Sequence, residues 1–361
     1  MLLREIAAPL AVGVLAILQL LVLVQLLQLN EVVFSGGMRL VDLGRVALAF
    51  APHFLVLALP LAYMVGIQLA IGRLSADREL LGLCSAGTSP LRLFRVPLAI
   101  AVVLAAVVAV LTRWAEPWGL QEVNRVLNEV IKRNLQHGLS PGIFNDNLPR
   151  FTVYVADAQD GRWQGVLIDD QVGDGSPLLV LAEKGQIEDA GGEALSLHLE
   201  RGEIHRMEPH GETVVRFREG TFLVGVQERV ARKNRFYGVE AALPYAELLA
   251  RAEQYRKQGW LNDATRIRVE IGRRWAVPLA CLCFALLGVP LAVFAGGTRG
   301  SAYLVTLGSF VLFYVMSRLG LALAERGLPA AVAAFSPDLA ILAIGIPLTL
   351  RLRSRGVPLV R

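Results

Sequence analysis

The chain has 361 residues, of which 54% are hydrophobic and 19% charged, and its mean hydropathy is +0.51. This balance lies well above that of a soluble enzyme and excludes a soluble protein. The formal net charge is +5, but many of the arginines stand in short stretches between apolar segments, where they set membrane topology. The charge therefore does not predict nucleic-acid binding.

Six apolar segments could cross a bilayer, which needs about 20 apolar residues per helix. Four of them carry no charged residue, the fifth carries Arg318, and the sixth is short. The six segments are 7–29, 46–71, 96–112, 275–297, 301–324 and 337–350. The first is too long for the apolar core of a signal peptide and no small-residue cleavage site closes it, so it is expected to remain as a helix.

The start of the sixth helix has its own local signals. Ser336 is a candidate N-cap, Pro337 fits the first helical position, and Asp338 adds an acid to the first turn. The sequence therefore predicts a helix that begins here, with Asp338 at the membrane interface.

Basic residues of the short loops give the orientation, because they resist translocation. If the spans alternate, these arginines all fall on one side, which is the cytoplasm. They are Arg4, Arg73, Arg78, Arg92, Arg95, Arg299, Arg351, Arg353, Arg355 and Arg361. Both termini are then cytoplasmic, and the block between Arg113 and Arg274 is periplasmic.

The polar block separates the chain into three predicted parts: 1–115 with three spans, 116–270 outside, and 271–361 with three more spans and a tail. A helical extension is expected over 116–136 and a helical lead back over 244–258. Between them lie short alternating runs that predict strands. These runs are 151–156, 165–169, 178–182, 195–200 and 213–217.

The strand pattern suits a β-sandwich, a jelly roll or an open barrel. An open sheet with an apolar interior could hold acyl chains away from water, whereas a closed core would be ordinary packing. The pattern leaves both possibilities open.

The loop after the second span, 75–88, predicts a short helix over 76–85 with Ser75 as its cap and Gly87 at its end. Asp77, Arg78 and Glu79 lead its first turn, and an apolar stripe follows. The stripe consists of Leu80, Leu83 and Cys84. Such a helix fits a groove in an ATPase subunit or lies on lipid, and its acidic first turn favours docking.

No motif for binding nucleotide phosphates, for zinc hydrolysis or for a serine nucleophile occurs, and the spans hold no pair of carboxylates. Cys281 and Cys283 point to different faces of a helix, so neither a disulfide nor a metal site is expected. The sequence predicts no catalytic residue, no metal and no cofactor, and the energy for any transport must come from another protein.

Arginines at the outer ends of spans offer a different chemistry. Arg318 lies in the outer half of the fifth span, and Arg113, Arg273 and Arg274 lie at similar depth. Guanidinium groups suit the phosphates of a lipid headgroup. For Arg113 and Arg273 anchoring of a helix end is the favoured interpretation, whereas Arg318 is expected to contact either lipid or a neighbouring helix.

Three segments carry a resemblance to a known family: 73–80 running to 86–89, 141–144 followed by 151–155, and 274–280 running through 285–291. They are similar to the lipopolysaccharide-export permeases, the LptF/LptG family, and more to the LptF form. The resemblance implies six transmembrane helices with a jellyroll-like β domain between helices 3 and 4. It also implies a half-transporter in the bacterial inner membrane.

On that resemblance the partners would be a paralogous permease, a dimeric cytoplasmic ATPase and a single-span periplasmic jellyroll protein. The substrate would be lipopolysaccharide from the outer leaflet of the inner membrane. Glu79 would meet the ATPase, and Gln25, Gln28 and Arg318 would line the lipid cavity.

The chain departs from the family pattern at Asn30 and Glu31, where a basic residue is common, and at Asp338, where Asn is usual. Two other classes remain open. A permease for another lipid or for lipoproteins would place its large domain after the first span, and a non-transporting, membrane-anchored binding protein would need no coupling helix.

Overall fold

The computed structural model describes residues 2–28, 39–86, 89–136, 141–145, 151–159, 162–170, 178–189, 194–208, 211–225, 239–294 and 299–356. The chain divides into two compact units. The first, here called the membrane unit, contains Met1–Leu23, Phe50–Gly119 and Glu240–Arg361. The second, the β unit, contains Val24–Ala49 and Leu120–Val239.

Six helical segments of the described chain are long and apolar enough to cross a membrane, as predicted. The third is built from two α-helices joined by a π-helical turn, so it continues without a break into the predicted extension. The helices are α1 (Leu2–Gln28), α3 (Leu40–Ala76), α5 (Arg95–Val110) with η2 (Leu111–Ala115) and α6 (Glu116–Gln136), α9 (Leu261–Phe294), α10 (Arg299–Glu325) and α11 (Ala330–Arg355). Short helices are α4 (Glu79–Ser85), η1 (Pro90–Phe94), η3 (Val239–Ala242) and α8 (Tyr245–Lys257).

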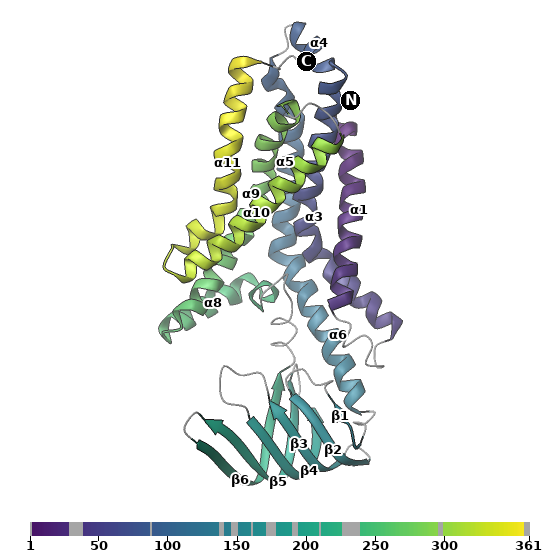
Figure 1. Cartoon of the computed structure of the whole chain (residues 1–361), viewed down its shortest axis with the longest axis vertical. Helices are drawn as coiled ribbons and strands as arrows, with labels where there is room; N and C mark the ends of the chain where they lie inside the picture. Colours follow the sequence, from purple (N-terminus) through teal and green to yellow (C-terminus); the bar gives the residue numbers. More distant parts are fainter. Residues whose placement is uncertain are drawn as a thin grey trace. The chain divides into compact units, whose positions relative to one another are not determined.

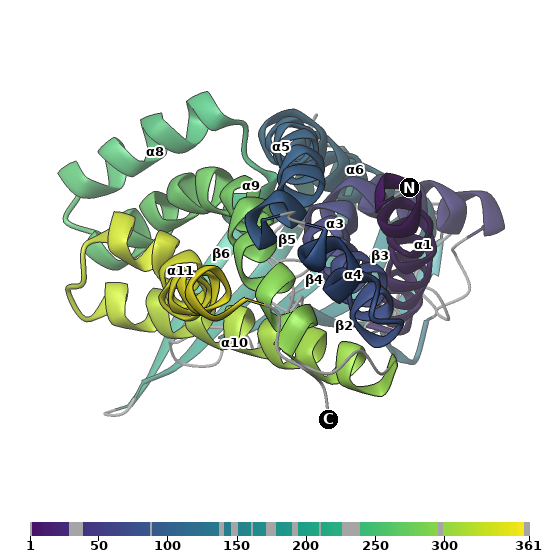
Figure 2. The ribbon, with the colours of Figure 1, turned by 90° about the horizontal axis from the view of Figure 1, so that it is seen from above.

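The six segments differ in how much of their apolar surface the chain itself covers. Within the described residues, 67% of the most apolar stretch of α3 and of α9 is buried, against 6% for α1 and 17% for α10. Figure 2 shows α1 and α10 at the edge of the membrane unit. Their apolar faces are therefore available to lipid or to another membrane protein.

Small residues set the close approaches between the helices. A Cβ on Gly66 would lie 2.9 Å from the carbonyl oxygen of Ile6, and one on Gly345 would lie 3.2 Å from the backbone nitrogen of Leu287. Glycine at these points lets α1 pack on α3 and α11 pack on α9 with their backbones close together.

The sixth helix does not begin where the local signals predicted. It starts at Ala330 instead of Ser336, and Pro337 and Asp338 lie inside it. Pro337 cannot donate a hydrogen bond to the carbonyl of Ala333, but the Ser336 hydroxyl donates to that oxygen at 2.8 Å. Asp338 is therefore not in the first turn of the helix as predicted, and its side chain is buried by the protein, with 1% of the residue exposed.

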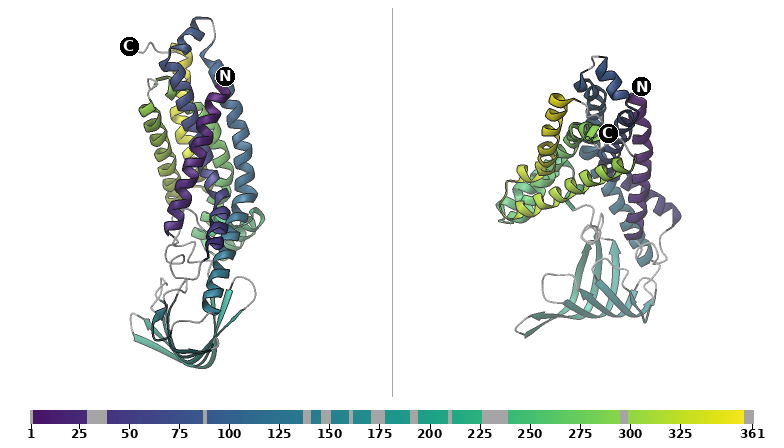
Figure 3. Two further views of the ribbon diagram at one scale, coloured as in Figure 1. Left: turned by 90° about the vertical axis from the view of Figure 1, so that its right-hand side faces the viewer. Right: turned by 45° about the horizontal axis from the view of Figure 1, so that its top comes forward.

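The β unit confirms the predicted β domain between the third and fourth spans. Its strands are longer than the alternating runs indicated, and all neighbouring pairs are antiparallel. They are β1 (Phe144–Asn145), β2 (Phe151–Gln159), β3 (Arg162–Asp170), β4 (Leu178–Asp189), β5 (Ala194–Glu208) and β6 (Gly211–Gly225). Among these strands the sheet order follows the chain order, a meander, and the sheet is bent into a trough (Figure 3).

Ion pairs hold the start of α3 against α6 within the β unit. Arg45 contacts Glu122 and Glu129 at 3.0 Å each, and Arg133 pairs with Asp42. The apolar face of α6 is fully buried at Leu120, Val123, Val126, Leu127 and Val130. An amphipathic helix that buries one face and pairs its charges on the other continues stably from the third span.

The lead back to the membrane is also helical, as predicted, and α8 packs on α9 through Leu248, Ala252 and Ile267. Because of this packing, residues 240–270 group with the membrane unit. The compact β unit therefore ends at Val239, earlier than the predicted outside block.

Candidate functional site

The predicted coupling segment forms a short helix, but with different bounds. α3 continues to Ala76, and α4 begins at Glu79 after Arg78, whose φ of 57° is left-handed. Ser75 therefore lies inside α3 and caps nothing. Its hydroxyl is buried and has no hydrogen-bond partner among the described residues. The predicted end at Gly87 lies outside the described residues.

The apolar stripe of this segment is divided between two roles. Leu80 is 1% exposed and packs in one cluster with Leu74, Phe94 and Leu352, whereas Leu83 is 48% exposed. Asp77, Arg78 and Glu79 are all exposed. Leu80 thus anchors α4 to the helix bundle, and Cys84 is partly buried. The four exposed residues of the segment form an outward surface, here called the docking face: Asp77, Arg78, Glu79 and Leu83.

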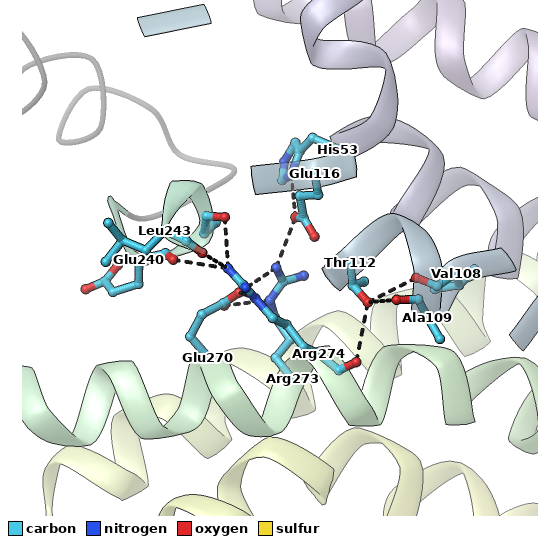
Figure 4. Close-up of polar contacts among 11 residues, drawn as sticks. His53, Val108, Ala109, Thr112, Glu116, Glu240, Leu243, Glu270, Arg273 and Arg274 are labelled. Carbon is cyan, nitrogen blue, oxygen red and sulfur yellow. Dashed lines mark hydrogen bonds and ion pairs between the residues drawn. The ribbon is translucent and has the colours of Figure 1, made fainter. Parts of the chain in front are cut away.

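A buried ion cluster lies where α3, α6 and α9 meet (Figure 4). The Glu116 carboxylate is 2.8 Å from Nδ1 of His53 and accepts a hydrogen bond from Nη2 of Arg273 at 3.0 Å. Arg273 also makes a two-point contact with Glu270 at 2.7 and 2.8 Å. With Arg274, described next, two arginines and two glutamates balance their charges here; Glu116 and Arg274 are buried, whereas Arg273 and Glu270 are partly exposed.

Arg274 completes this cluster from the next position of α9. Its Nη2 donates to the carbonyl oxygens of Ala241 at 3.1 Å and Leu243 at 2.7 Å, and its Nε lies 3.4 Å from Glu270. The residue is 4% exposed. These contacts tie η3, the segment that returns from the β unit, to α9. The lipid-phosphate role of Arg274 stays a prediction.

The π-helical turn η2 lies directly before Glu116. Thr112 in this turn has its hydroxyl within hydrogen-bond distance of the Val108 carbonyl, at 3.0 Å, and of the Arg274 carbonyl, at 3.4 Å. π-turns in α-helices occur often at functional sites. Two sequence signals could have located the cluster. Glu116 stands four residues after the third apolar segment, 96–112, and Glu270 stands one turn before Arg273 and Arg274.

Arg113 fits the predicted anchoring role. Its guanidinium stacks over the rings of Tyr245 at 4.2 Å and Trp275 at 4.8 Å. Contacts of this kind hold a cation against aromatic faces at the end of a span.

Arg318 lies on α10 with its side chain exposed. Its Nε donates to the Tyr314 hydroxyl at 3.2 Å, and its guanidinium carbon is 5.2 Å from the centre of that ring. The sequence has no acidic residue one helical turn from Arg318. In the structure the phenol of Tyr314, four residues earlier, is the hydrogen-bond partner at that distance. Tyr314 therefore orients the arginine on the surface of the membrane unit.

The remaining lipid candidates lie near the end of α1. Gln25 is buried, and its Oε1 has no hydrogen-bond partner among the described residues. The side chain of Gln28 lies outside the described part. Gln25 groups with the β unit, whereas Arg318 and Arg274 group with the membrane unit, so the structure establishes no common site for these candidates.

Six helices that could cross a membrane, a β domain inserted between the third and fourth, and a short helix packed against the helix bundle define a polytopic membrane protein. The family model of the lipopolysaccharide export system permease LptF/LptG matches residues 1–351. The chain belongs to this family, which confirms the resemblance seen in its motifs.

Individual relatives agree with the family. The chain is 24% identical over 249 residues to the lipopolysaccharide export system permease protein LptF of Escherichia coli strain K12 and to proteins of the same name from Escherichia coli O157:H7 and Shigella flexneri. The match covers 67% of this chain and 63% of each relative. Less than two thirds of the length of these relatives is therefore matched.

Proposed function

We propose that this chain is a permease subunit of an ATP-driven lipopolysaccharide exporter in the bacterial inner membrane. It has no enzymatic activity of its own in this proposal. The family match over residues 1–351 is the observation that carries it. The names of the LptF relatives support the same substrate and the LptF-like form.

The docking face is the proposed contact for a separate dimeric ATPase. The start of α1, the helix α4 and the end of α11 all lie at one end of the membrane unit (Figure 1). With the arginine asymmetry of the loops, this supports a cytoplasmic placement of that end, and a periplasmic β domain. Leu80 packs in one cluster with Phe94 and Leu352, so a displacement of α4 would be transmitted to η1 and to the last turns of α11.

A second, paralogous permease is proposed to cover part of α1 and α10, which the chain leaves most exposed. The lipid would enter between such faces from the outer leaflet, with Gln25, Gln28 and Arg318 as candidate contacts. Arg318 supports this role because it is exposed on α10 and offers guanidinium donors to a phosphate. The β unit would then pass the lipid to a single-span periplasmic jellyroll protein.

Purification from mild detergent tests the proposal directly. The tagged chain should bring down an ATPase subunit and a paralogous permease, and lipid A should be found by mass spectrometry of the complex. Recovery of the folded chain without an ATPase and without lipid A would count against an exporter and favour a membrane-anchored binding protein.

A further inference from the structure

The short turn between α8 and α9 presents two adjacent apolar side chains outward. Trp260 is 55% exposed and Leu261 is 65% exposed. Gly259 has φ 80°, and its amide donates to the carbonyl of Arg256 at 3.3 Å. The amide of Trp260 donates to the carbonyl of Tyr255 at 3.0 Å. A helix end closed by a left-handed glycine in this way fixes the direction in which the chain leaves α8.

The packing of α8 on α9 holds the ring of Trp260 in place. The ring centre lies 5.4 Å from that of Tyr255. Tyr255 in turn packs against the buried cluster of Leu248, Ala252 and Ile267. The exposure of Trp260 and of its neighbour is therefore a fixed feature of this helical hairpin, and large apolar side chains held together at a surface indicate contact with another apolar surface.

The hairpin starts at the level where the third span ends and the fourth begins. Arg113 at the end of the third span stacks over Tyr245, the first residue of α8, and over Trp275 of α9. Trp114 and Trp118, which follow Arg113, are 64% and 63% exposed. Tryptophans gather at the boundary between the hydrocarbon core and the headgroups. Figure 1 shows α8 at this end of the membrane unit, running sideways from the spans.

One side of α9 carries an exposed stripe from the span to this turn. Leu261, Arg268 and Trp275 follow one another at a spacing of seven residues, about two turns of helix, so they lie on the same side. All three are exposed. Leu279, one turn further into the span, is exposed on that side as well. The stripe therefore joins the surface that faces acyl chains to the turn at the end of α8.

Two basic side chains of the hairpin have no acidic partner among the described residues. Lys257 lies at the end of α8 and Arg268 lies in the stripe, and both are exposed. The neighbouring Arg256 is already paired with Glu253 at 2.8 Å. Asp263 stands five residues before Arg268 and so points about 140° away from it around α9. Cations in this position, beside exposed apolar side chains, are complementary to the phosphates of lipid headgroups.

We propose that the hairpin of α8 and α9 lies on the bilayer surface as an anchor. Trp260 and Leu261 enter the boundary of the acyl chains, and Lys257 and Arg268 bind the phosphates of anionic phospholipids. Figure 2 shows α8 at the edge of the membrane unit, on the other side of α9 from α10. A second permease that covers α1 and α10 would therefore leave this surface open to lipid. The anchor holds the outer end of α9 at a set depth, whatever substrate is transported.

Fluorescent labels on the full chain in nanodiscs test the membrane contact. The discs contain phosphatidylcholine and phosphatidylglycerol in equal parts and no lipopolysaccharide. Cys84 is replaced by Ser, the other two cysteines are buried, and one label is placed at Leu261→Cys, at Val103→Cys on the exposed side of α5, or at Val214→Cys on β6. The label at Leu261→Cys should be shielded from aqueous iodide, like that at Val103→Cys, and quenched by a phospholipid with a spin-labelled headgroup. Iodide quenching equal to that at Val214→Cys would overturn the anchor.

Charge reversal tests the phosphate contact. Lys257→Glu combined with Arg268→Glu should lower the ratio of phosphatidylglycerol to phosphatidylcholine that stays on the folded chain in detergent, measured by mass spectrometry. The control combines Arg125→Glu with Arg216→Glu, which makes the same change in net charge at exposed positions of the β unit. A fall in the hairpin variant alone supports the contact. An unchanged ratio in the hairpin variant, or an equal fall in both variants, would overturn it.

Discussion

The carboxylate of Glu116 accepts a hydrogen bond from Arg273 at 3.0 Å, across 157 residues of sequence. Glu116 stands where the third span leads toward the β unit, and Arg273 stands where the returning chain enters the fourth. The pair, with His53 and Glu270, therefore joins the end of the third span to α3 and α9 within the membrane unit. Because the carboxylate is buried, loss of either partner leaves an uncompensated charge.

Glu116→Ala is expected to destabilise the membrane unit by about 3–5 kcal/mol, as for other broken buried pairs. Thermal unfolding of the purified chain in detergent measures this. Glu253→Ala is the control, because Glu253 pairs with Arg256 at the surface of α8 and should cost less than about 1 kcal/mol. Equal effects of the two changes would show that the cluster does not hold the helices together.

Substitutions at Leu80 and Leu83 should affect stability differently, because Leu80 anchors α4 to the bundle and Leu83 belongs to the exposed docking face. Leu80→Ala is expected to lower stability by about 2–4 kcal/mol because it leaves a cavity in the apolar cluster. Leu83→Ala should change stability little, since Leu83 is exposed. Unfolding of both variants in detergent tests this, and a larger loss for Leu83→Ala would contradict the two roles.

Glu79→Lys should weaken retention of the ATPase without affecting insertion or folding, because it reverses a charge on the docking face. Glu247→Lys on α8 is a control at a half-buried surface position far along the chain, where the glutamate pairs with Arg251. The measurement is the amount of ATPase that copurifies. Unchanged retention and unchanged export would remove Glu79 from the contact.

Asp338→Asn is expected to raise stability by about 1–3 kcal/mol, because both carboxylate oxygens are buried and a neighbour that hydrogen-bonds the carboxylate is the thiol of Cys283, a weak donor. An amide of the same shape carries no charge. Asp263→Asn in the exposed first turn of α9 serves as the comparison. A loss of stability or of export in Asp338→Asn would show that the ionisable group itself is required.

Arg318→Ala is expected to lower crosslinking of lipopolysaccharide to the membrane unit more than it lowers thermal stability. Tyr314→Phe, which removes the hydroxyl acceptor and keeps the ring, should have a smaller effect on crosslinking. A large loss of stability, with crosslinking per folded complex unchanged, would make Arg318 a structural residue.

Gly165→Ala should destabilise the β unit by about 1–3 kcal/mol, through positive φ and the contact with Ala156. Arg201→Gly should be neutral or stabilising, because glycine adopts the left-handed conformation at little cost and the surface pair with Glu183 is weak. Unfolding of both variants, followed by circular dichroism, checks the opposite signs. Effects of the same sign would contradict the role of backbone strain at Gly165 and Arg201.

Local pattern in the sequence determined the number of spans, the helical extension 116–136 and the position of all five longer strands. Long apolar stretches and alternation of period two reflect the free energy of transferring a segment's side chains from water to an apolar environment. That free energy depends on the residues of the segment itself. The start of α11 was misjudged for the same reason. Ser336, Pro337 and Asp338 form a valid cap in isolation, and only packing makes them the interior of a helix.

Tertiary structure alone decided which groups meet. The pairing of Glu116 with Arg273 joins residues distant in the chain, and the burial of Leu80 near an exposed Leu83 distinguishes residues of the same type. The physical reason is that an ion, a leucine or a glycine has its energy set by the partners that the fold brings to it, and no local pattern specifies those partners.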